Sequence, residues 1–157
     1  MTVARRALPA DAPEVLRLRQ VMIDELAGSP GPTGWHDAAL PTLHARLGEA
    51  DGTFAAFVVD FPERPGALAA LVAGTVDYRI GKDSDGADGL VGFVFSVATD
   101  PDARRRGYSR AGMTALLDWF RERGARRVRL TASPAAAPLY GSLGFLPKPD
   151  PLLELRL

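Results

Sequence analysis

The chain has 157 residues, of which 46% are hydrophobic and 24% are charged, and these values are typical of one folded globular domain rather than a disordered chain. Its 19 basic residues balance its 19 acidic residues, so the overall charge gives no reason to expect nucleic acid as a partner. The absence of cysteine excludes a disulfide framework, a thiolate nucleophile and a cysteine zinc site.

The N-terminus is charged, and no run approaches the ~20 apolar residues that a membrane-spanning helix needs. We therefore expect a cytoplasmic protein with a single domain over residues 1–157 and no membrane contact.

The first part of the chain predicts two helices joined by a loop. After a short strand over residues 3–8, Asp11 caps a helix over residues 12–26, where apolar residues recur at steps of three and four. Residues 28–34 include two prolines and three glycines, which cannot continue a helix, so this loop is a candidate lid. A second helix is expected over residues 36–49.

The remainder of the chain alternates strands and helices. Apolar or alternating segments predict strands over residues 53–60, 67–78 and 90–98. One broad apolar face predicts a long helix over residues 106–123, which Gly124 ends. A short strand, a short helix and a final strand are expected over residues 128–131, 135–143 and 152–157.

A strand, a charged turn and a helix N-terminus follow one another between residues 90 and 110. The apolar strand leads through Asp100-Pro101-Asp102 into the turn Arg104-Arg105-Arg106-Gly107. The first turn of a helix leaves backbone N–H groups unpaired and carries about half a positive charge, so such a turn can bind an anion. Gly107 permits close approach of the backbone, and the three arginines and Arg110 can contact phosphate oxygens. An RRRG sequence by itself, however, is more often the solvated basic start of a helix.

Two motifs in this region resemble those of the GNAT superfamily of N-acetyltransferases. The first is Val97-Ala98-Thr99-Asp100-Pro101 followed by Arg104-x-Arg106-Gly107-x-Ser109, which is similar to the acyl-CoA motif Q/R-x-x-G-x-G/A. The second, about thirty residues further on, is Leu139-Tyr140-Gly141-Ser142-Leu143-Gly144-Phe145, which has a tyrosine ahead of Gly-Phe. The resemblance covers roughly residues 90–146, and the two helices before this region match the family only in layout.

The resemblance implies a GNAT-like fold of the α/β (α+β) class, with a mixed, mostly antiparallel sheet of roughly six to seven strands and helices on both faces. It also implies acetyl-CoA as co-substrate, bound where the strands over residues 90–98 and 128–131 separate. In the family, the end of the first of these strands pairs with the pantetheine arm and the following turn wraps the pyrophosphate. The residues expected to bind the cofactor are Val97, Ala98, Thr99, Arg104, Arg105, Arg106, Gly107, Tyr108, Ser109, Arg110 and Ser133.

Two of these positions depart from the family pattern. Ser109 stands where glycine or alanine is usual, and its hydroxyl can hydrogen-bond a phosphate or crowd the turn. Ser133 stands where many members have asparagine, so a serine takes over the contribution of that amide, or the contribution is absent.

For catalysis, the resemblance implies that Tyr140 protonates the departing CoA thiolate. A phenol with a pKa near 10 can give a proton to a thiolate leaving group after an amine has attacked. The alternative is that Tyr140 only packs its ring and hydrogen-bonds a backbone group. We assign no general base: Asp24, Glu25 or Asp77 could accept a proton directly or through water, but solvation at the surface is the simpler explanation of each of them.

Three other functions compete with this interpretation. The sequence from Gly107 to Ala111 is one residue away from the G-x-S-x-G elbow of serine hydrolases, but no histidine follows it. The histidines His36 and His44 are eight residues apart and have no third partner at ligand spacing, so we expect no metal. A non-catalytic acyl-CoA sensor remains the main alternative.

The expected partners are acetyl-CoA and an amine acceptor, with a homodimer left open. The acceptor should lie between the loops over residues 27–36 and 79–89, and its identity cannot be inferred from the sequence.

Overall fold

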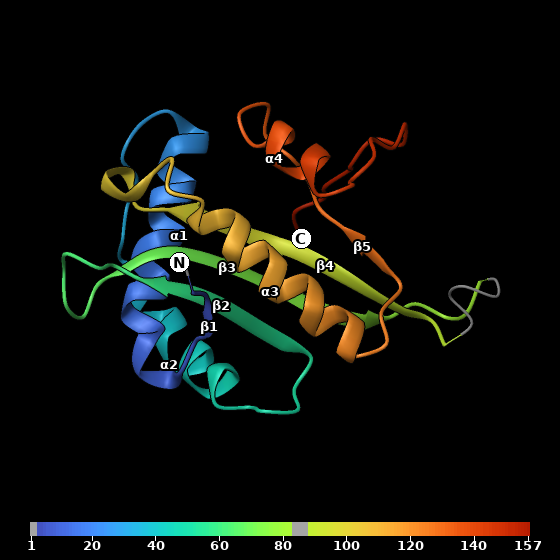
Figure 1. The fold of residues 1–157 in the computed structure, drawn as a ribbon, viewed down its shortest axis with the longest axis horizontal. Coiled ribbons are helices and arrows are strands. Elements are labelled where there is room, and N and C mark those ends of the chain that lie inside the picture. The colour runs from blue at the N-terminus through green and yellow to red at the C-terminus, as the bar shows by residue number, and fades with distance from the viewer. Residues whose placement is uncertain (1–2, 83–87) are drawn as a thin grey trace.

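The computed structural model describes residues 3–82 and 88–157, in which five strands form one sheet in the order β1-β2-β3-β4-β5. Each pair of neighbours from β1 to β4 is antiparallel, and only the pair of β4 and β5 in the described sheet is parallel. The sheet is therefore mixed and mostly antiparallel, as predicted (Figure 1). The strands are β1 (Arg5–Arg6), β2 (Phe54–Asp60), β3 (Leu68–Tyr78), β4 (Leu90–Thr99) and β5 (Arg127–Arg129).

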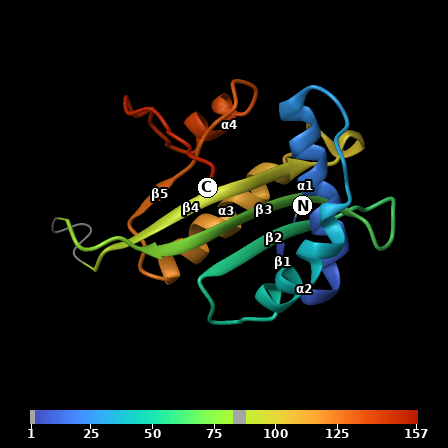
Figure 2. The same ribbon diagram turned by 180° about the vertical axis from the view of Figure 1, so that it is seen from behind.

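Helices cover both faces of this sheet. The helix α3 crosses one face, and α1 and α2 lie on the other, as the two opposite views show (Figures 1 and 2). The short helix α4 lies beyond β5, across from the end of α1 (Figure 1). The helices are α1 (Ala12–Ala27), α2 (Trp35–Leu47), α3 (Tyr108–Glu122) and α4 (Ala137–Ser142). None of the helices in the described ranges is both long and apolar enough to cross a membrane.

The central strand β3 contributes to the hydrophobic core on both faces of the sheet. Every residue from Leu68 to Gly74 is buried, because α1 covers one face of the strand and α3 covers the other. Leu71 packs in the core beneath α1, and its neighbour Val72 packs beneath α3. Alternate residues of a strand point to opposite faces, so a continuous apolar run serves both cores.

An irregularity in β4 shapes the edge of the sheet. Ala73 pairs with Ser96 and Gly74 pairs with Val94, so Phe95 is an extra residue that forms a β-bulge. The parallel pairing with β5 covers only three residues of β4, from Val91 to Phe93. The second half of β4 therefore runs without a strand beside it on the β5 side, within the part of the chain that the structure describes.

Two sequence predictions about strands were wrong. Residues 152–157 form no strand, and the leucines Leu152, Leu153, Leu155 and Leu157 are 78–116% exposed, so the described sheet has five strands instead of six to seven. The alternating pattern of this segment identifies a chain that could form a strand, but a strand also requires pairing with a neighbour, and this segment pairs with no strand of the described sheet. The first strand is likewise limited to Arg5 and Arg6, because the chain turns into α1 directly afterwards.

The close packing of α3 on the sheet depends on Gly112. A Cβ atom at this position would lie 2.6 Å from Cγ2 of the fully buried Val72, which cannot move aside. Alanine is favoured over glycine in a helix by about 1 kcal/mol, but overpacking a core costs about 1–3 kcal/mol. We predict that Gly112→Ala destabilises the protein by about 1–2 kcal/mol in urea unfolding.

The matched control is Gly141→Ala in α4, where a Cβ would meet nothing within 4 Å. This variant should be as stable as the wild type or more so. Gly112→Ala should cost less stability when Val72 is also alanine, because Val72→Ala removes the Cγ2 methyl group with which the new Cβ would clash. Additive effects in the double variant would contradict the steric explanation.

Candidate cofactor and active site

The carboxylate of Asp100 fixes the junction between β4 and the turn that follows. Asp100 is 3% exposed; its carboxylate accepts a hydrogen bond from the amide of Asp102 at 2.9 Å and ion-pairs with Arg17 at 2.8 Å and Arg64 at 3.7 Å. Burial by itself would raise the pKa of this carboxyl, but the amide and the two guanidinium groups outweigh burial and hold the pKa below its usual range. Asp100 is therefore charged at neutral pH.

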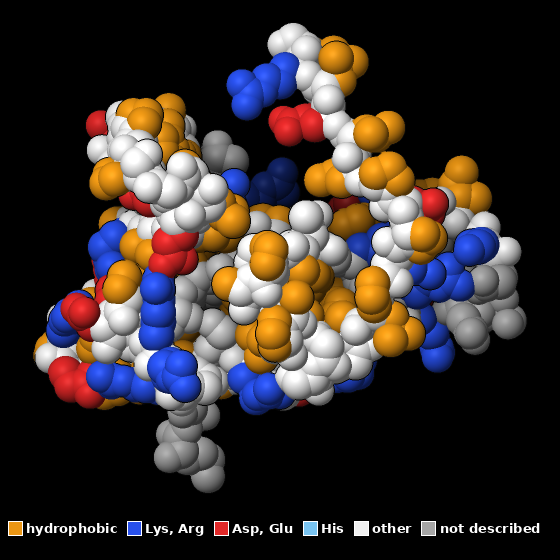
Figure 3. All heavy atoms as spheres, turned by 90° about the horizontal axis from the view of Figure 1, so that it is seen from above, with side chains coloured by type: hydrophobic (Ala, Val, Ile, Leu, Met, Phe, Trp, Pro, Cys, Tyr) orange, Lys and Arg blue, Asp and Glu red, His pale blue; other side chains and the backbone are white. Residues whose placement is uncertain are grey.

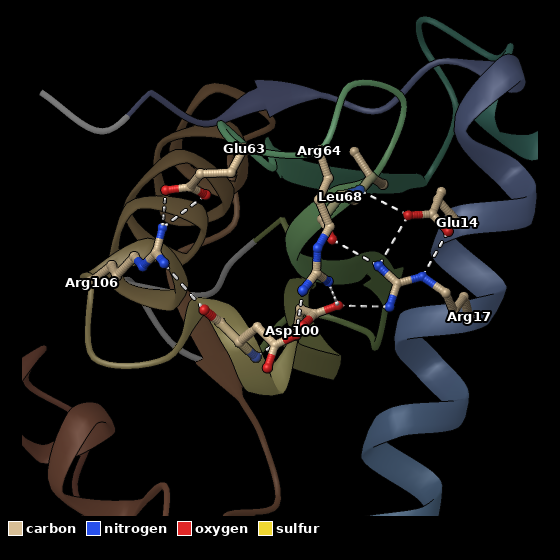
Figure 4. Close-up of polar contacts among 8 residues, drawn as sticks. Glu14, Arg17, Glu63, Arg64, Leu68, Asp100 and Arg106 are labelled. Atoms are coloured by element: carbon tan, nitrogen blue, oxygen red, sulfur yellow. Dashed lines mark hydrogen bonds and ion pairs between the residues drawn. The ribbon is translucent and has the colours of Figure 1, made fainter.

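The same network joins this junction to α1 and β3. Arg17 donates to the Leu68 carbonyl at 2.9 Å and to both carboxylate oxygens of Glu14, and Glu14 accepts from the Leu68 amide at 2.8 Å. Figure 4 shows how Arg17 lies between Glu14 and Asp100, with Arg64 on the other side of the Asp100 carboxylate. Helix, strand and turn are thus held together by charge-assisted hydrogen bonds.

A cavity of about 200 Å³ lies at the turn itself. The residues that line it are Thr99, Ala103, Arg104, Arg105, Gly107, Tyr108, Ser109, Arg110 and Leu139. Gly107 has φ of +78° and Arg105 has φ of +62°, so the chain turns sharply before α3 begins at Tyr108. The N-terminus of α3, with its unpaired N–H groups, therefore opens at this cavity.

Two of the hydroxyl groups at the cavity are joined to each other. Thr99 Oγ1 at the end of β4 and Ser109 Oγ in the first turn of α3 are 2.5 Å apart and share a hydrogen bond. Ser109 thus connects the strand to the helix, and its hydroxyl is accommodated without displacing the turn. This contact explains how serine fits a position where the family usually has glycine or alanine.

The arginines of the turn differ in their partners. Arg104 forms an ion pair with Glu25 of α1, and Arg106 forms bonds of 2.8 and 3.0 Å with Glu63. Figure 4 shows Arg106 directed toward Glu63, and Arg106 does not line the cavity. Arg110 donates to the Ser142 hydroxyl at 2.7 Å. Arg105 has no ion pair or hydrogen bond to the described residues. Of the three consecutive arginines, Arg105 is the one that lines the cavity without a carboxylate partner in the part of the chain that the structure describes.

Tyr140 lies in α4, next to the cavity-lining Leu139. Its side chain is 6% exposed, with its ring centre 5.9 Å from that of Phe145, and burial raises the pKa of its hydroxyl. The Tyr140 hydroxyl has no hydrogen-bond partner among the described residues. Every side-chain oxygen that is fully buried in this part of the chain has such a partner, so the Tyr140 hydroxyl is not fully buried. The hydroxyl therefore reaches accessible space, while the ring is held in the core. The Arg110–Ser142 bond joins α4 to α3 at this point.

Other predicted site residues lie outside the cavity. Val97 packs toward the α3 core and Ala98 toward the α1 core, so only their backbone is available at the strand edge. Ser133 Oγ accepts from the amide of Ala136 at 3.3 Å, just before α4 begins. Ala103 and Leu139 line the cavity although no sequence motif pointed to them, because small and apolar residues carry no chemical signal of their own.

Two of the three candidate bases, Asp24 and Glu25, and the candidate lid are also tied to neighbours. Glu25 is paired with Arg104, and Asp24 accepts from the amide of Gly31 at 2.9 Å, which fixes the loop after α1. Gln20 accepts from Trp35 Nε1 at 2.9 Å and bonds His36 Nε2 at 3.1 Å, so the far end of this loop is held as well. The second expected acceptor loop, over residues 79–89, includes residues 83–87, which lie outside the described residues.

Comparison with known proteins decides the family. The model of the acetyltransferase (GNAT) family matches residues 21–145. The chain belongs to this family. It is also 41% identical over 70 residues to the mycothiol acetyltransferase of Thermobispora bispora, a match that spans 43% of this chain and 24% of that protein.

Two solved structures show the fold over nearly their whole length. A GCN5-related N-acetyltransferase from Ralstonia eutropha is 25% identical, with a TM-score of 0.78 and 99% of each chain covered. A predicted acetyltransferase from Clostridium acetobutylicum, solved with acetyl-CoA, is 19% identical, with a TM-score of 0.80, 99% of this chain and 96% of that chain covered. The GNAT-like fold expected from the two motifs is thereby confirmed.

The buried Asp100 carboxylate gives the stability of the protein a defined pH dependence. Because its pKa is lowered in the folded state, its contribution is complete above the unfolded pKa near 4 and is lost as the pH falls through the folded value. We predict that Asp100→Asn lowers the free energy of unfolding by about 1–3 kcal/mol at pH 7. The difference from the wild type should shrink toward pH 3, measured by urea unfolding at both pH values.

Asp118→Asn is the control, because Asp118 forms only an exposed ion pair with Arg121 on α3. Its effect should stay within about 0.5 kcal/mol at either pH. An Asp100→Asn effect as small as that of the control would show that the network does not stabilise the junction.

Proposed function

We propose that the chain is an acetyl-CoA-dependent N-acetyltransferase that moves the acetyl group to an amine acceptor by direct attack. The observation that carries the proposal is the turn before α3, where a left-handed Gly107, a helix N-terminus and Arg105, which has no ion pair to a described residue, surround one cavity. Unpaired backbone N–H groups and a free guanidinium suit a pyrophosphate, which carries several acceptor oxygens. Membership of the acetyltransferase family supports the same assignment.

The unpaired edge of β4 supplies the second part of the proposed cofactor site. Beyond Phe93 the strand has no β5 partner, so the backbone groups of Val97 to Thr99 on that side are available to the amide groups of a pantetheine arm. Thr99 also lines the cavity at the turn, so the strand edge and the pyrophosphate site are continuous. An extended arm held along β4 would place its thioester near the bulge, between α1 and α4.

In the proposed reaction the acceptor nitrogen attacks the thioester carbonyl, and the carbon–sulfur bond breaks as the amide forms. The Tyr140 hydroxyl donates its proton to the leaving thiolate, and the proton of the amine passes to solvent or to an acceptor that we do not assign. A raised pKa suits this role, because the phenol remains protonated throughout the physiological pH range. The immobilised ring holds the hydroxyl in one place.

The alternative is a protein that binds acyl-CoA without transferring the acyl group. The pairing of Glu25 with Arg104, and of Asp24 with the loop after α1, leaves both carboxylates occupied and favours this alternative. Release of thiol from acetyl-CoA across a panel of amines distinguishes the two: tight CoA binding without turnover would support the sensor.

A cytoplasmic location, a single domain and a homodimer stay predictions.

The role of Tyr140 can be tested by removing only its hydroxyl. We predict that Tyr140→Phe lowers kcat by about 10²- to 10⁴-fold, while CoA affinity and thermal stability change little. The control is Tyr78→Phe, whose side chain is 71% exposed, and this variant should keep its full kcat. An unchanged kcat in Tyr140→Phe across the pH range would eliminate the general acid.

The role of the turn can be tested with two glycines of the same helix. Gly107 and Gly124 have φ of +78° and +86° at opposite ends of α3, so alanine is strained at both positions. A Cβ at Gly107 meets no protein atom within 4 Å and would lie at the cavity. We predict that Gly107→Ala weakens CoA binding by at least about tenfold in calorimetry, whereas Gly124→Ala does not. Equal losses in the two variants would mean that strain alone is responsible.

A further inference from the structure

Arg19 of α1 carries a charge that no residue described here neutralises. Its guanidinium donates one hydrogen bond, from Nη1 to the Ser96 hydroxyl at 2.5 Å, and it has no carboxylate partner within residues 3–82 and 88–157. Arg19 is half-buried, and Ser96 is only 2% exposed. A guanidinium has five N–H donors, so one neutral hydroxyl leaves most of its bonding capacity unused.

The neighbouring charges on α1 are arranged differently. Arg17 is paired with Glu14 and Asp100, and Glu25 at the far end of the helix is paired with Arg104. Asp24 is occupied by amide donors. Withdrawing a cation from water is unfavourable unless an anion or sufficient hydrogen bonds replace the solvent. Arg17 receives this compensation from the carboxylates of Glu14 and Asp100. An anionic ligand would provide the same compensation for Arg19.

The position of Ser96 indicates that this anion is not the pyrophosphate of the cofactor. Ser96 directly follows the bulge residue Phe95, on the stretch of β4 that has no β5 partner. It precedes Thr99 by three residues, roughly 10 Å along an extended strand, so Arg19 lies away from the pyrophosphate turn. In the view of Figure 3 the surface is hollowed between the end of α1 and the C-terminal segment, and basic side chains lie at the bottom of this hollow.

We propose that Arg19 binds an anionic group, a carboxylate, of the amine acceptor. This inference rests on the proposed acetyl transfer and narrows its acceptor to amines that also carry a carboxylate, as amino acids do. Two N–H groups of the guanidinium can contact both carboxylate oxygens, with Ser96 fixing the orientation of the guanidinium. Phe95, which is 45% exposed and lies beside Phe54, offers an apolar surface next to this charge for the rest of the acceptor.

The experiment compares matched acceptors: free amino acids, the corresponding amino acid amides, and aminoalkyl phosphates of similar length. The wild type should use the carboxylates with kcat/KM about 10- to 100-fold higher than the amides. In Arg19→Gln this preference should disappear because KM for the amino acids rises, while kcat for the amides stays unchanged. Arg19→Lys keeps the positive charge but loses the two parallel N–H donors of the guanidinium. Its preference for carboxylates over amides should lie between those of the wild type and of Arg19→Gln. Arg126→Gln, which removes an exposed arginine at the far end of α3, should behave as the wild type.

Binding measured by calorimetry to the CoA-saturated protein separates this inference from the proposed function. If no amine is acetylated but carboxylates still bind and Arg19→Gln abolishes that binding, acetyl transfer fails and the anion site stands. If the wild type shows no preference for carboxylates in turnover or binding, or if Arg19→Gln retains the preference, the inference is wrong. A preference for the phosphates over the carboxylates would also overturn it.

Discussion

The carboxylate of Asp100 lies where β4 ends, and the geometry of the site depends on what it contacts. Its ion pair with Arg17 joins the turn to α1, and its bond to the Asp102 amide shapes the first residues of the turn. Arg17 also reaches the Leu68 carbonyl at the start of β3. Because a half-buried arginine and a buried aspartate satisfy one another, the turn begins from a fixed point. Gly107 can then direct the N-terminus of α3 at the cavity.

Small residues let the long helix lie close enough to the sheet to keep that geometry. Gly112 lies against Val72, and Gly74 and Gly92 leave room for the ring of Phe120, since a Cβ on either would come within 2.8 Å of it. The helix that opens at the cavity is therefore positioned along its whole length by core packing. The bulge at Phe95 and the early end of the β5 pairing then open one edge of β4 on the same side of the molecule.

Charge is distributed unevenly around this opening. Arg104 and Arg106 are neutralised by Glu25 and Glu63, so these two arginines help to fix the turn in place, while the backbone amides and Arg105 are left to contact an anion. On the α1 side, Arg19 remains without a carboxylate. Arg105 and Arg110 line the proposed pyrophosphate site and Arg19 lies beside the bulge, and none of the three has a carboxylate partner among the described residues. Local pairing, more than the number of arginines, thus determines where an anion is favoured.

The sequence by itself determined the features that depend on neighbouring residues. Dihedral preference and apolar periodicity act over a few residues, so the turn at Gly107, the helix that follows it and the two family motifs could be predicted. Most helix and strand positions were also predicted to within a few residues. The same reasoning predicted a strand over residues 152–157, because an alternating pattern does not reveal whether the segment pairs with another strand.

Only the tertiary structure decided which charged groups meet. Arg17 and Asp100 are 83 residues apart, and Arg19 and Ser96 are 77 residues apart, so no local pattern could pair them. With 19 basic and 19 acidic residues, the sequence permits many pairings of similar chemistry. Packing of α1 across β4 selects among them: it neutralises Arg17, and it brings no carboxylate of residues 3–82 and 88–157 to Arg19.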